Sequence, residues 1–163
     1  MKNLLKLAGA LLLVTALSTN SKAQVKFSGG LDLGYVLNSG YGLSIGASVG
    51  GEYPIGDNMG ATFIAGYDKV LVSGASVSLI PFQAGFKYYL TDNKSGLYGH
   101  GQLGLTMYSV SVMGYSASTT NFSYSIGGGY LLNEHIDLGA RFQIVSASGG
   151  SLSWLAFRAA YNF

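Results

Sequence analysis

The feature that most constrains the fold of this sequence is a strict alternation of apolar residues with small or polar ones. In residues 41–53 the odd positions hold Tyr, Leu, Ile, Ala, Val, Gly and Tyr, and the even positions hold Gly, Ser or Glu. A period of two places successive side chains on opposite faces of a β-strand. An amphipathic helix needs apolar residues three and four positions apart, which this segment lacks. The pattern therefore predicts a strand with one apolar and one polar face.

The same alternation recurs in eight segments, and turn-forming residues separate them. The segments are residues 26–38, 41–53, 59–69, 77–90, 97–112, 121–132, 136–145 and 152–163. Three connectors (54–58, 91–96 and 133–135) are compact and carry charges, whereas those between them are longer or rich in Ser and Gly. Compact turns at one end and variable loops at the other are typical of barrels in bacterial outer membranes. We therefore predict an all-β fold, an eight-stranded antiparallel up-and-down transmembrane β-barrel.

The composition excludes the main alternatives to a membrane barrel. Charged residues make up 10% of the 163 residues, against roughly a quarter in an ordinary soluble domain. Low charge also argues against disorder, which accompanies low hydrophobicity and high net charge. No apolar run reaches the ~18 residues that a membrane-spanning helix needs. The chain has no cysteine, which excludes disulfides and thiolate metal sites.

Residues 1–23 have the pattern of a secretory signal peptide. Lys2 and Lys6 precede an apolar run at 7–17, and Ser21 and Ala23 supply the small residues of a cleavage site before Gln24. A buried N-terminal helix is the alternative. We expect a signal peptide at 1–23 and a transmembrane barrel domain at 24–163. Without the first segment, six basic and seven acidic residues remain, so the sequence indicates no basic surface for nucleic acid.

The placement of charge predicts which face of the strands meets lipid. The predicted strands contain nine charged residues, and all of them except Lys69, at the end of its strand, fall on the polar face. A Lys or Arg that faces lipid at mid-bilayer costs about 2–4 kcal/mol in such barrels, so the polar face should point inward. An eight-stranded barrel has an interior just wide enough for side chains, and buried charges must be paired. We predict a lumen filled by a network of salt bridges and hydrogen bonds among Asp32, Glu52, Lys87, His100, Asp137, Arg141 and Arg158.

The last segment resembles a known family. Residues 157–163 (FRAAYNF) alternate apolar side chains and end in Phe, which is similar to the C-terminal assembly signal of outer-membrane barrels. The chain resembles small OmpA/OmpX-like barrels and the outer-membrane β-barrel domain proteins of Bacteroidota, whose signal peptides often end in Ala-Gln, as Ala23-Gln24 does here. The resemblance implies the outer membrane of a Gram-negative bacterium, contact with outer-membrane lipid, and recognition by the barrel assembly machinery through Phe157, Tyr161 and Phe163.

Motifs for catalysis and cofactor binding are weak. Residues 42–46 and 46–50 match G-x-S-x-G, and 99–104 match G-x-G-x-x-G, but a nucleophile elbow or a phosphate loop needs a following helix. His100 and His135 are the two histidines, and no carboxylate spacing supports a metal site. We expect no catalytic, cofactor-binding or metal-binding residues. The sequence favours a structural or surface-interaction protein of the envelope; the alternatives are a narrow porin-like channel, with the lumen charges as its filter, and a lipid-modifying enzyme.

Overall fold

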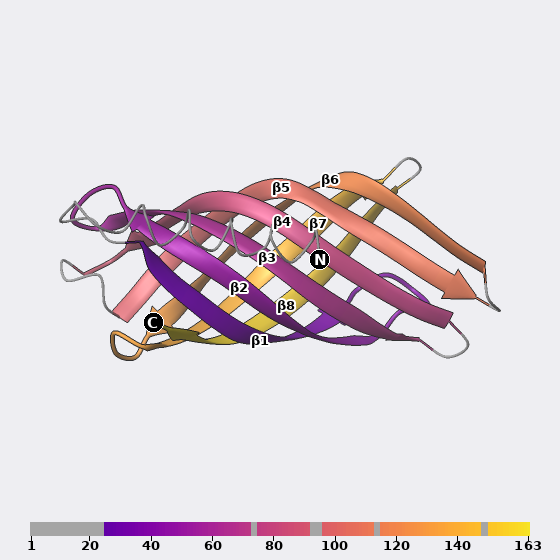
Figure 1. Cartoon of the computed structure of the whole chain (residues 1–163), viewed down its shortest axis with the longest axis horizontal. Coiled ribbons are helices and arrows are strands. Elements are labelled where there is room, and N and C mark those ends of the chain that lie inside the picture. Colours follow the sequence, from indigo (N-terminus) through magenta and orange to yellow (C-terminus); the bar gives the residue numbers. More distant parts are fainter. Residues whose placement is uncertain (1–24, 73–74, 92–95, 113–114, 148–149) are drawn as a thin grey trace, which may run out of the picture.

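The computed structural model describes residues 25–72, 75–91, 96–112, 115–147 and 150–163 (Figure 1). The predicted signal peptide at 1–23 lies outside these residues. The described part contains eight strands: β1 (Lys26–Val36), β2 (Leu43–Pro54), β3 (Met59–Val72), β4 (Ala75–Tyr89), β5 (Gly96–Val112), β6 (Tyr115–Leu131), β7 (Ile136–Ala147) and β8 (Gly150–Asn162). It holds no helix that is long and apolar enough to cross a membrane.

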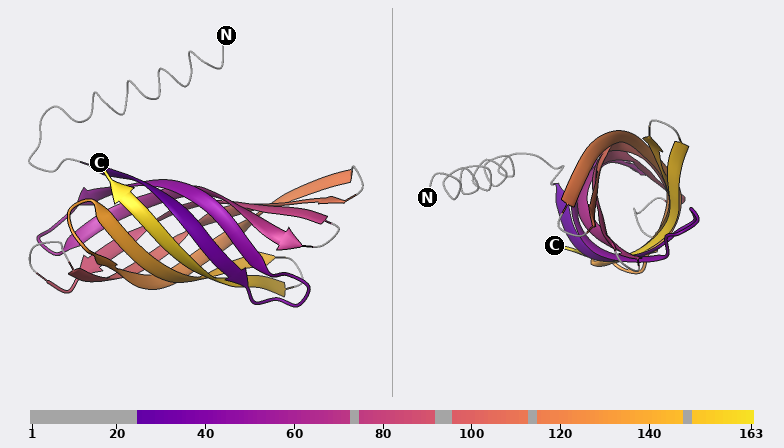
Figure 2. Two further views of the ribbon diagram at one scale, coloured as in Figure 1. Left: turned by 90° about the horizontal axis from the view of Figure 1, so that it is seen from below. Right: turned by 90° about the vertical axis from the view of Figure 1, so that its right-hand side faces the viewer.

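The strands close into a barrel. Each strand pairs antiparallel with its neighbour in sequence, and β1 pairs with β8. Seen end-on, the strands form a ring (Figure 2). Closure leaves no sheet edge within the bilayer, where backbone groups have no water to bind. The predicted eight-stranded antiparallel barrel is confirmed.

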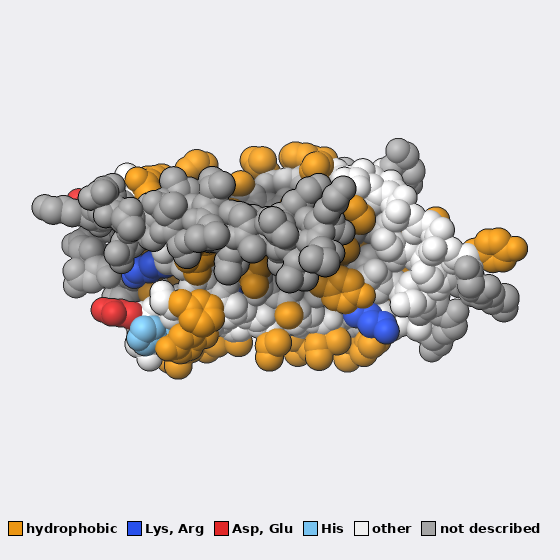
Figure 3. Space-filling view, in the orientation of Figure 1, with side chains coloured by type: hydrophobic (Ala, Val, Ile, Leu, Met, Phe, Trp, Pro, Cys, Tyr) orange, Lys and Arg blue, Asp and Glu red, His pale blue; other side chains and the backbone are white. Residues whose placement is uncertain are grey.

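The outer face of the barrel is apolar, as the alternation predicts. Leu31, Ile45 and Ile126 are examples of large side chains that point outward and are well exposed, and apolar side chains stand out along the upper and lower margins of the molecule in Figure 3. The residues next to them in the sequence, such as Asp32, Ser44 and Ser125, point inward and are buried. An apolar exterior suits hydrocarbon, because it needs no hydrogen-bond partners there.

The two ends of the barrel differ. One end, the turn end, carries the start of β1, the end of β8, the end of β4, the start of β5 and the connectors 55–58 and 132–135. The compactness of the last connector has a visible cause, since Asn133 Oδ1 accepts hydrogen bonds from the backbone N–H groups of His135 and Ile136. The opposite end, the hairpin end, carries a projecting β5–β6 hairpin (Figure 1). In the β1–β2 connection at this end, Gly40 has φ +86°, a conformation that glycine adopts without strain.

The sixth strand begins earlier than predicted. Residues 113–120 read as a loop because they lack apolar alternation, yet β6 starts at Tyr115 and pairs with β5 from Val112↔Tyr115 onward. The segment is exposed throughout 115–120, so neither face needs apolar residues. Its register with β7 starts only at Ser123. The outer part of β6 therefore has an open edge beyond the barrel wall.

Candidate functional site in the barrel lumen

The polar side chains in the half of the lumen near the turn end centre on Lys87 of β4. Lys87 Nζ lies 2.8 Å from Asp137 Oδ2 and 3.4 Å from Glu52 Oε2. Tyr89 donates to both oxygens of Glu52, at 2.9 and 3.1 Å, and Tyr98 donates to Asp137 Oδ1 at 2.5 Å. The ammonium also lies 4.2 Å from the centre of the Tyr98 ring. This Lys87 cluster (Glu52, Lys87, Tyr89, Tyr98 and Asp137) thus gives each carboxylate both a cation and a hydroxyl, which buried ion pairs require.

A second group lies between β1, β2, β7 and β8. Arg141 Nη2 is 3.0 Å from Asp32 Oδ1, and Ser48 donates to Asp32 Oδ2. Arg158 donates from Nε to Ser48 Oγ at 2.9 Å and from Nη2 to Ser28 Oγ at 3.1 Å. Arg158 therefore reaches Asp32 through the Ser48 hydroxyl.

Two of the predicted network residues lie in the lumen without an ion pair. Within the described part of the chain, no carboxylate oxygen lies within 4.0 Å of Arg158. His100 Nε2 instead forms a 2.8 Å hydrogen bond with Thr62 Oγ1. Serine and threonine hydroxyls on neighbouring strands bind these two side chains, so their described contacts are hydrogen bonds to neutral groups rather than ion pairs.

Sequence reasoning missed the role of the tyrosines. Tyr98 was not among the predicted lumen residues, but it is 7% exposed and points into the lumen. A Cβ on Gly129 or Gly139 would meet the Tyr98 hydroxyl, so the ring depends on these glycines for its space. The sequence did contain a signal for this position. Tyr98 is two residues from His100 and four from Gln102, so it shares their face of β5.

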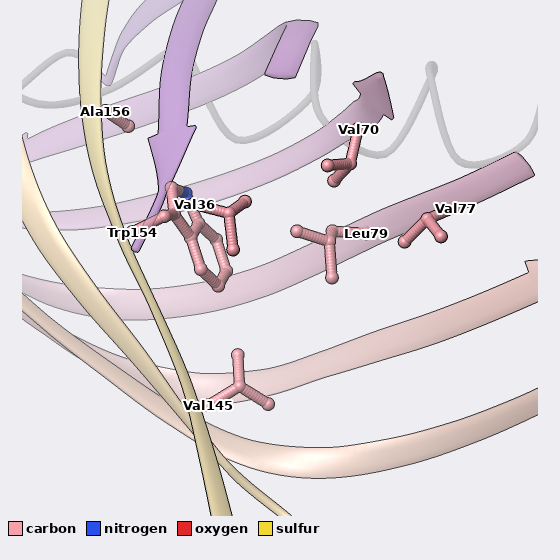
Figure 4. Packing of buried hydrophobic residues seen from close by; sticks show 7 residues of the cluster. All are labelled: Val36, Val70, Val77, Leu79, Val145, Trp154 and Ala156. Atoms are coloured by element: carbon pink, nitrogen blue, oxygen red, sulfur yellow. The ribbon is translucent and has the colours of Figure 1, made fainter. Parts of the chain in front are cut away.

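An apolar layer occupies the lumen towards the hairpin end, where such barrels are usually polar inside. Its side chains come from five strands and point towards one another (Figure 4). The layer consists of Val36, Val70, Val77, Leu79, Val145, Trp154 and Ala156, each at most 3% exposed. Tyr41 and Tyr108 pack against it and share a 2.7 Å hydrogen bond between their hydroxyls.

A cavity of about 60 Å³ lies among the polar groups, in the half of the lumen near the turn end. Lys87, Tyr98, His100, Arg141 and Arg158 are among its lining residues. A cavity of this volume has room for several water molecules. The lumen therefore has two parts, a packed apolar layer and a small polar chamber.

The C-terminal strand closes the barrel at the turn end. Phe157, Tyr161 and Phe163 all point outward and are exposed. The Tyr161 ring stacks on His135, with 5.2 Å between ring centres and 8° between planes. The Phe163 N–H donates to Phe27 O at 2.8 Å. The three aromatic side chains thus line the lipid-facing side of the β8–β1 closure.

The described residues offer little for metal binding or nucleophilic catalysis. Among them, no three His, Asp or Glu side chains come together in a way that could hold a metal ion. Ser44 and Ser48, the centres of the two G-x-S-x-G matches, are buried in strand β2. His100 points into the lumen, and His135 lies in the connector that precedes β7.

A closed antiparallel barrel of eight strands with an apolar exterior and charged groups inside is an integral outer-membrane β-barrel. The chain matches the model of the outer membrane protein beta-barrel domain over residues 7–163 and belongs to that family. Its localisation is accordingly the outer membrane of a Gram-negative bacterium. In such proteins the short turns face the periplasm, so the turn end is periplasmic and the hairpin end is extracellular.

Solved structures share this fold at low sequence identity. Ail, the attachment invasion locus protein of Yersinia pestis, is 16% identical with a TM-score of 0.64, covering 88% of this chain and 100% of Ail. The N-terminal β-barrel domain of Pseudomonas aeruginosa OprF is 15% identical with a TM-score of 0.63, covering 87% and 100%. Neisserial surface protein A is 15% identical with a TM-score of 0.61, covering 87% and 98%. No curated protein sequence matches the chain.

Proposed function

We propose that this protein is a sealed barrel that conducts neither ions nor solutes and serves the envelope structurally or through contacts at its outer surface. The observation that carries the proposal is the apolar layer. Its members are buried and come from five of the eight strands. A dry apolar constriction blocks ions because an ion that enters it loses its hydration. The paired charges of the Lys87 cluster add a second obstruction below it.

The projecting β5–β6 hairpin supports a role at the extracellular surface. Tyr115 at its tip is 86% exposed, and residues 105–112 and 115–122 contain no charged side chain. Contacts through this hairpin would be aromatic and hydrogen-bonded. Ail has been crystallised with the heparin analogue sucrose octasulfate, a polyanion whose recognition needs cations. Because the hairpin segments hold no Lys or Arg, we propose no polyanion ligand for them.

A narrow channel is the second candidate, and the chamber in the periplasmic half of the lumen favours it. For this function the apolar layer would have to open. We propose no enzymatic role, because membrane-embedded hydrolysis of lipid needs a nucleophile and a base on the outer face. The described histidines do not supply that base at mid-barrel, as His100 points inward and His135 lies in a periplasmic connector.

Conductance of the protein in planar lipid bilayers tests the proposal. The wild-type barrel is expected to give no current steps. A double variant, Leu79→Ala with Trp154→Ala, empties the centre of the apolar layer and should produce current. The matched control, Phe82→Ala with Phe157→Ala, removes outward-facing side chains from the same two strands and should stay silent. Steady wild-type current that changes on substitution of Glu52 or Lys87 would establish the channel instead.

A further inference from the structure

More basic than acidic side chains line the periplasmic chamber. Its lining includes four basic side chains (Lys26, Lys87, Arg141 and Arg158) and two acidic ones (Glu52 and Asp137). Lys87 is paired with both of these carboxylates, and Arg141 is paired with Asp32 outside the lining. Arg158 and Lys26 remain without a carboxylate partner among the described residues. When Asp32 is counted, three carboxylates face the three lumen cations Lys87, Arg141 and Arg158, so the excess cation is Lys26 at the exposed rim. The attraction of the chamber for an anion therefore comes from Arg158, a lining guanidinium whose described hydrogen bonds go to neutral hydroxyls.

The hydrogen bonds in the chamber leave donors rather than acceptors unused. Arg158 uses two of its five N–H groups, both on neutral hydroxyls, and a guanidinium accepts nothing. Gln102 also lines the chamber and is 6% exposed. Its Oε1 accepts from Ser125 Oγ at 3.3 Å, while its Nε2 has no partner. A buried donor without an acceptor is unfavourable, and a ligand with only acceptor atoms would satisfy it.

Together, the unpaired guanidinium and the unused amide donor identify a class of ligand. We propose that the chamber is a binding site for a small tetrahedral oxyanion of the phosphate type, held by Arg158 and Gln102. Charge-assisted hydrogen bonds from Arg to phosphate oxygens are among the strongest in proteins. The cavity of about 60 Å³ has room for one ion of this size.

The ligand reaches the site from the periplasm. The chamber lining includes Lys26 at the start of β1 and Asn162 at the end of β8, both at the turn end of the barrel. Lys26 is exposed at this rim, where it attracts anions to the opening. The opposite end of the chamber is closed only if the apolar layer seals the lumen, so the blind shape of the pocket rests on the proposed function. Binding itself does not depend on the seal.

Isothermal titration of the protein purified from outer membranes and placed in lipid nanodiscs tests the site. Inorganic phosphate is titrated at constant ionic strength, with chloride as the reference anion. One phosphate per barrel is expected. Arg158→Gln should weaken binding by about tenfold or more, since it removes a charged donor. Gln102→Leu should weaken it by about fivefold, the effect of one neutral hydrogen bond.

Two control variants separate the site from general effects. Lys69→Gln removes an exposed, outward-facing cation, and Gln83→Leu removes a glutamine that is as buried as Gln102 but does not line the chamber. Both should bind phosphate like the wild type. No phosphate heat above the chloride reference, or equal affinity in wild type and Arg158→Gln, would overturn the proposal. A loss of binding in Lys69→Gln as large as in Arg158→Gln would do the same, because it would reveal only general attraction.

A second titration, with glycerol 3-phosphate, distinguishes the two sources of such an oxyanion. Binding of phosphate alone would assign the site to the free ion, whereas equal binding of the ester would assign it to a phosphorylated headgroup. Either result retains the site. If the barrel conducts current yet binds phosphate through Arg158, the sealed-barrel function fails and the anion site stands. Gln102→Leu keeps the test decisive if Arg158→Gln does not fold.

Discussion

At the scale of single residues, Lys87 is the described cation with two carboxylate partners. It serves two buried carboxylates, Glu52 and Asp137. We expect Lys87→Met to lower the free energy of unfolding by about 3–5 kcal/mol, because it leaves buried negative charge without a partner. Urea unfolding in lipid vesicles measures the change.

The control for this prediction is Lys69→Met, which removes a cation from the outer face near the hairpin end. Its effect should stay within about 0.5 kcal/mol, as for other surface substitutions. Equal unfolding midpoints for the two variants would show that the Lys87 cluster adds no stability. The loss of stability on replacing Arg158 should be smaller, since Arg158 bonds to Ser28 and Ser48 rather than to a carboxylate.

Glycines that face the two sides of the barrel wall should respond oppositely to alanine. A Cβ at Gly85, which points inward, would collide with the Gly101 carbonyl oxygen, whereas a Cβ at Gly101 would meet open space on the outer face. Gly85→Ala should therefore destabilise by about 1–3 kcal/mol, the usual cost of overpacking. Gly101→Ala should stabilise by up to about 1 kcal/mol, because it restricts the unfolded chain. If Gly85→Ala and Gly101→Ala shifted the unfolding midpoint in the same direction, this assignment of faces would be contradicted.

At the scale of elements, the β5–β6 hairpin should be dispensable for folding. Its outer part has no register with β7, since that pairing begins at Ser123. We expect that replacing residues 111–116 with Asn-Gly, which favours a two-residue hairpin turn, leaves the free energy of unfolding within about 0.5 kcal/mol of the wild-type value. Any binding at the cell surface that uses Tyr115 should be lost. A barrel that no longer folds after this change would show that the hairpin nucleates β5–β6 pairing.

The last strand should matter more for assembly than for stability. We propose that the outward row Phe157, Tyr161 and Phe163 is what the assembly machinery recognises, as the family resemblance implies. Phe163→Ala should lower the amount of protein in the outer membrane of cells, while purified protein still folds in vesicles. Leu138→Ala, an outward residue that faces Ala159 in the register with β8, is the control and should assemble normally. A parallel loss in cells and in vesicles would assign a stability role instead.

The sequence predicted some elements better than others for physical reasons. The lipid-facing strands were found because hydrocarbon demands an apolar residue at every second position, as in Leu43, Ile45 and Val49 of β2. The start of β6 was missed because Ser116 and Thr119 lie outside the barrel wall and meet water on both faces. The alternation of apolar and polar residues disappears where both faces of a strand meet water, instead of lipid on one face and the lumen on the other.

At the scale of the whole molecule, the alternation along each strand predicted which residues point into the lumen. It did not predict that the lumen would separate into an apolar and a polar half. Asp32, Arg141 and Arg158 were placed inside by their positions alone. The apolar layer was not foreseen, because Val70 and Val145 each lie beside a further apolar residue that points outward, and Val77 lies between two serines on the face that was expected to be polar. Separation of the lumen into an apolar and a polar half depends on the stagger between strands, which no single strand encodes.

The position of the chain's one tryptophan gives the molecule an internal optical reporter. Trp154 belongs to β8, the last strand to leave the ribosome, yet it packs beside Val36 of the first. Indole emission shifts to the blue when water is excluded from the ring. During refolding into vesicles, the blue shift should therefore appear only when the two ends of the chain have met. A time course of emission would record the moment of ring closure without any added label.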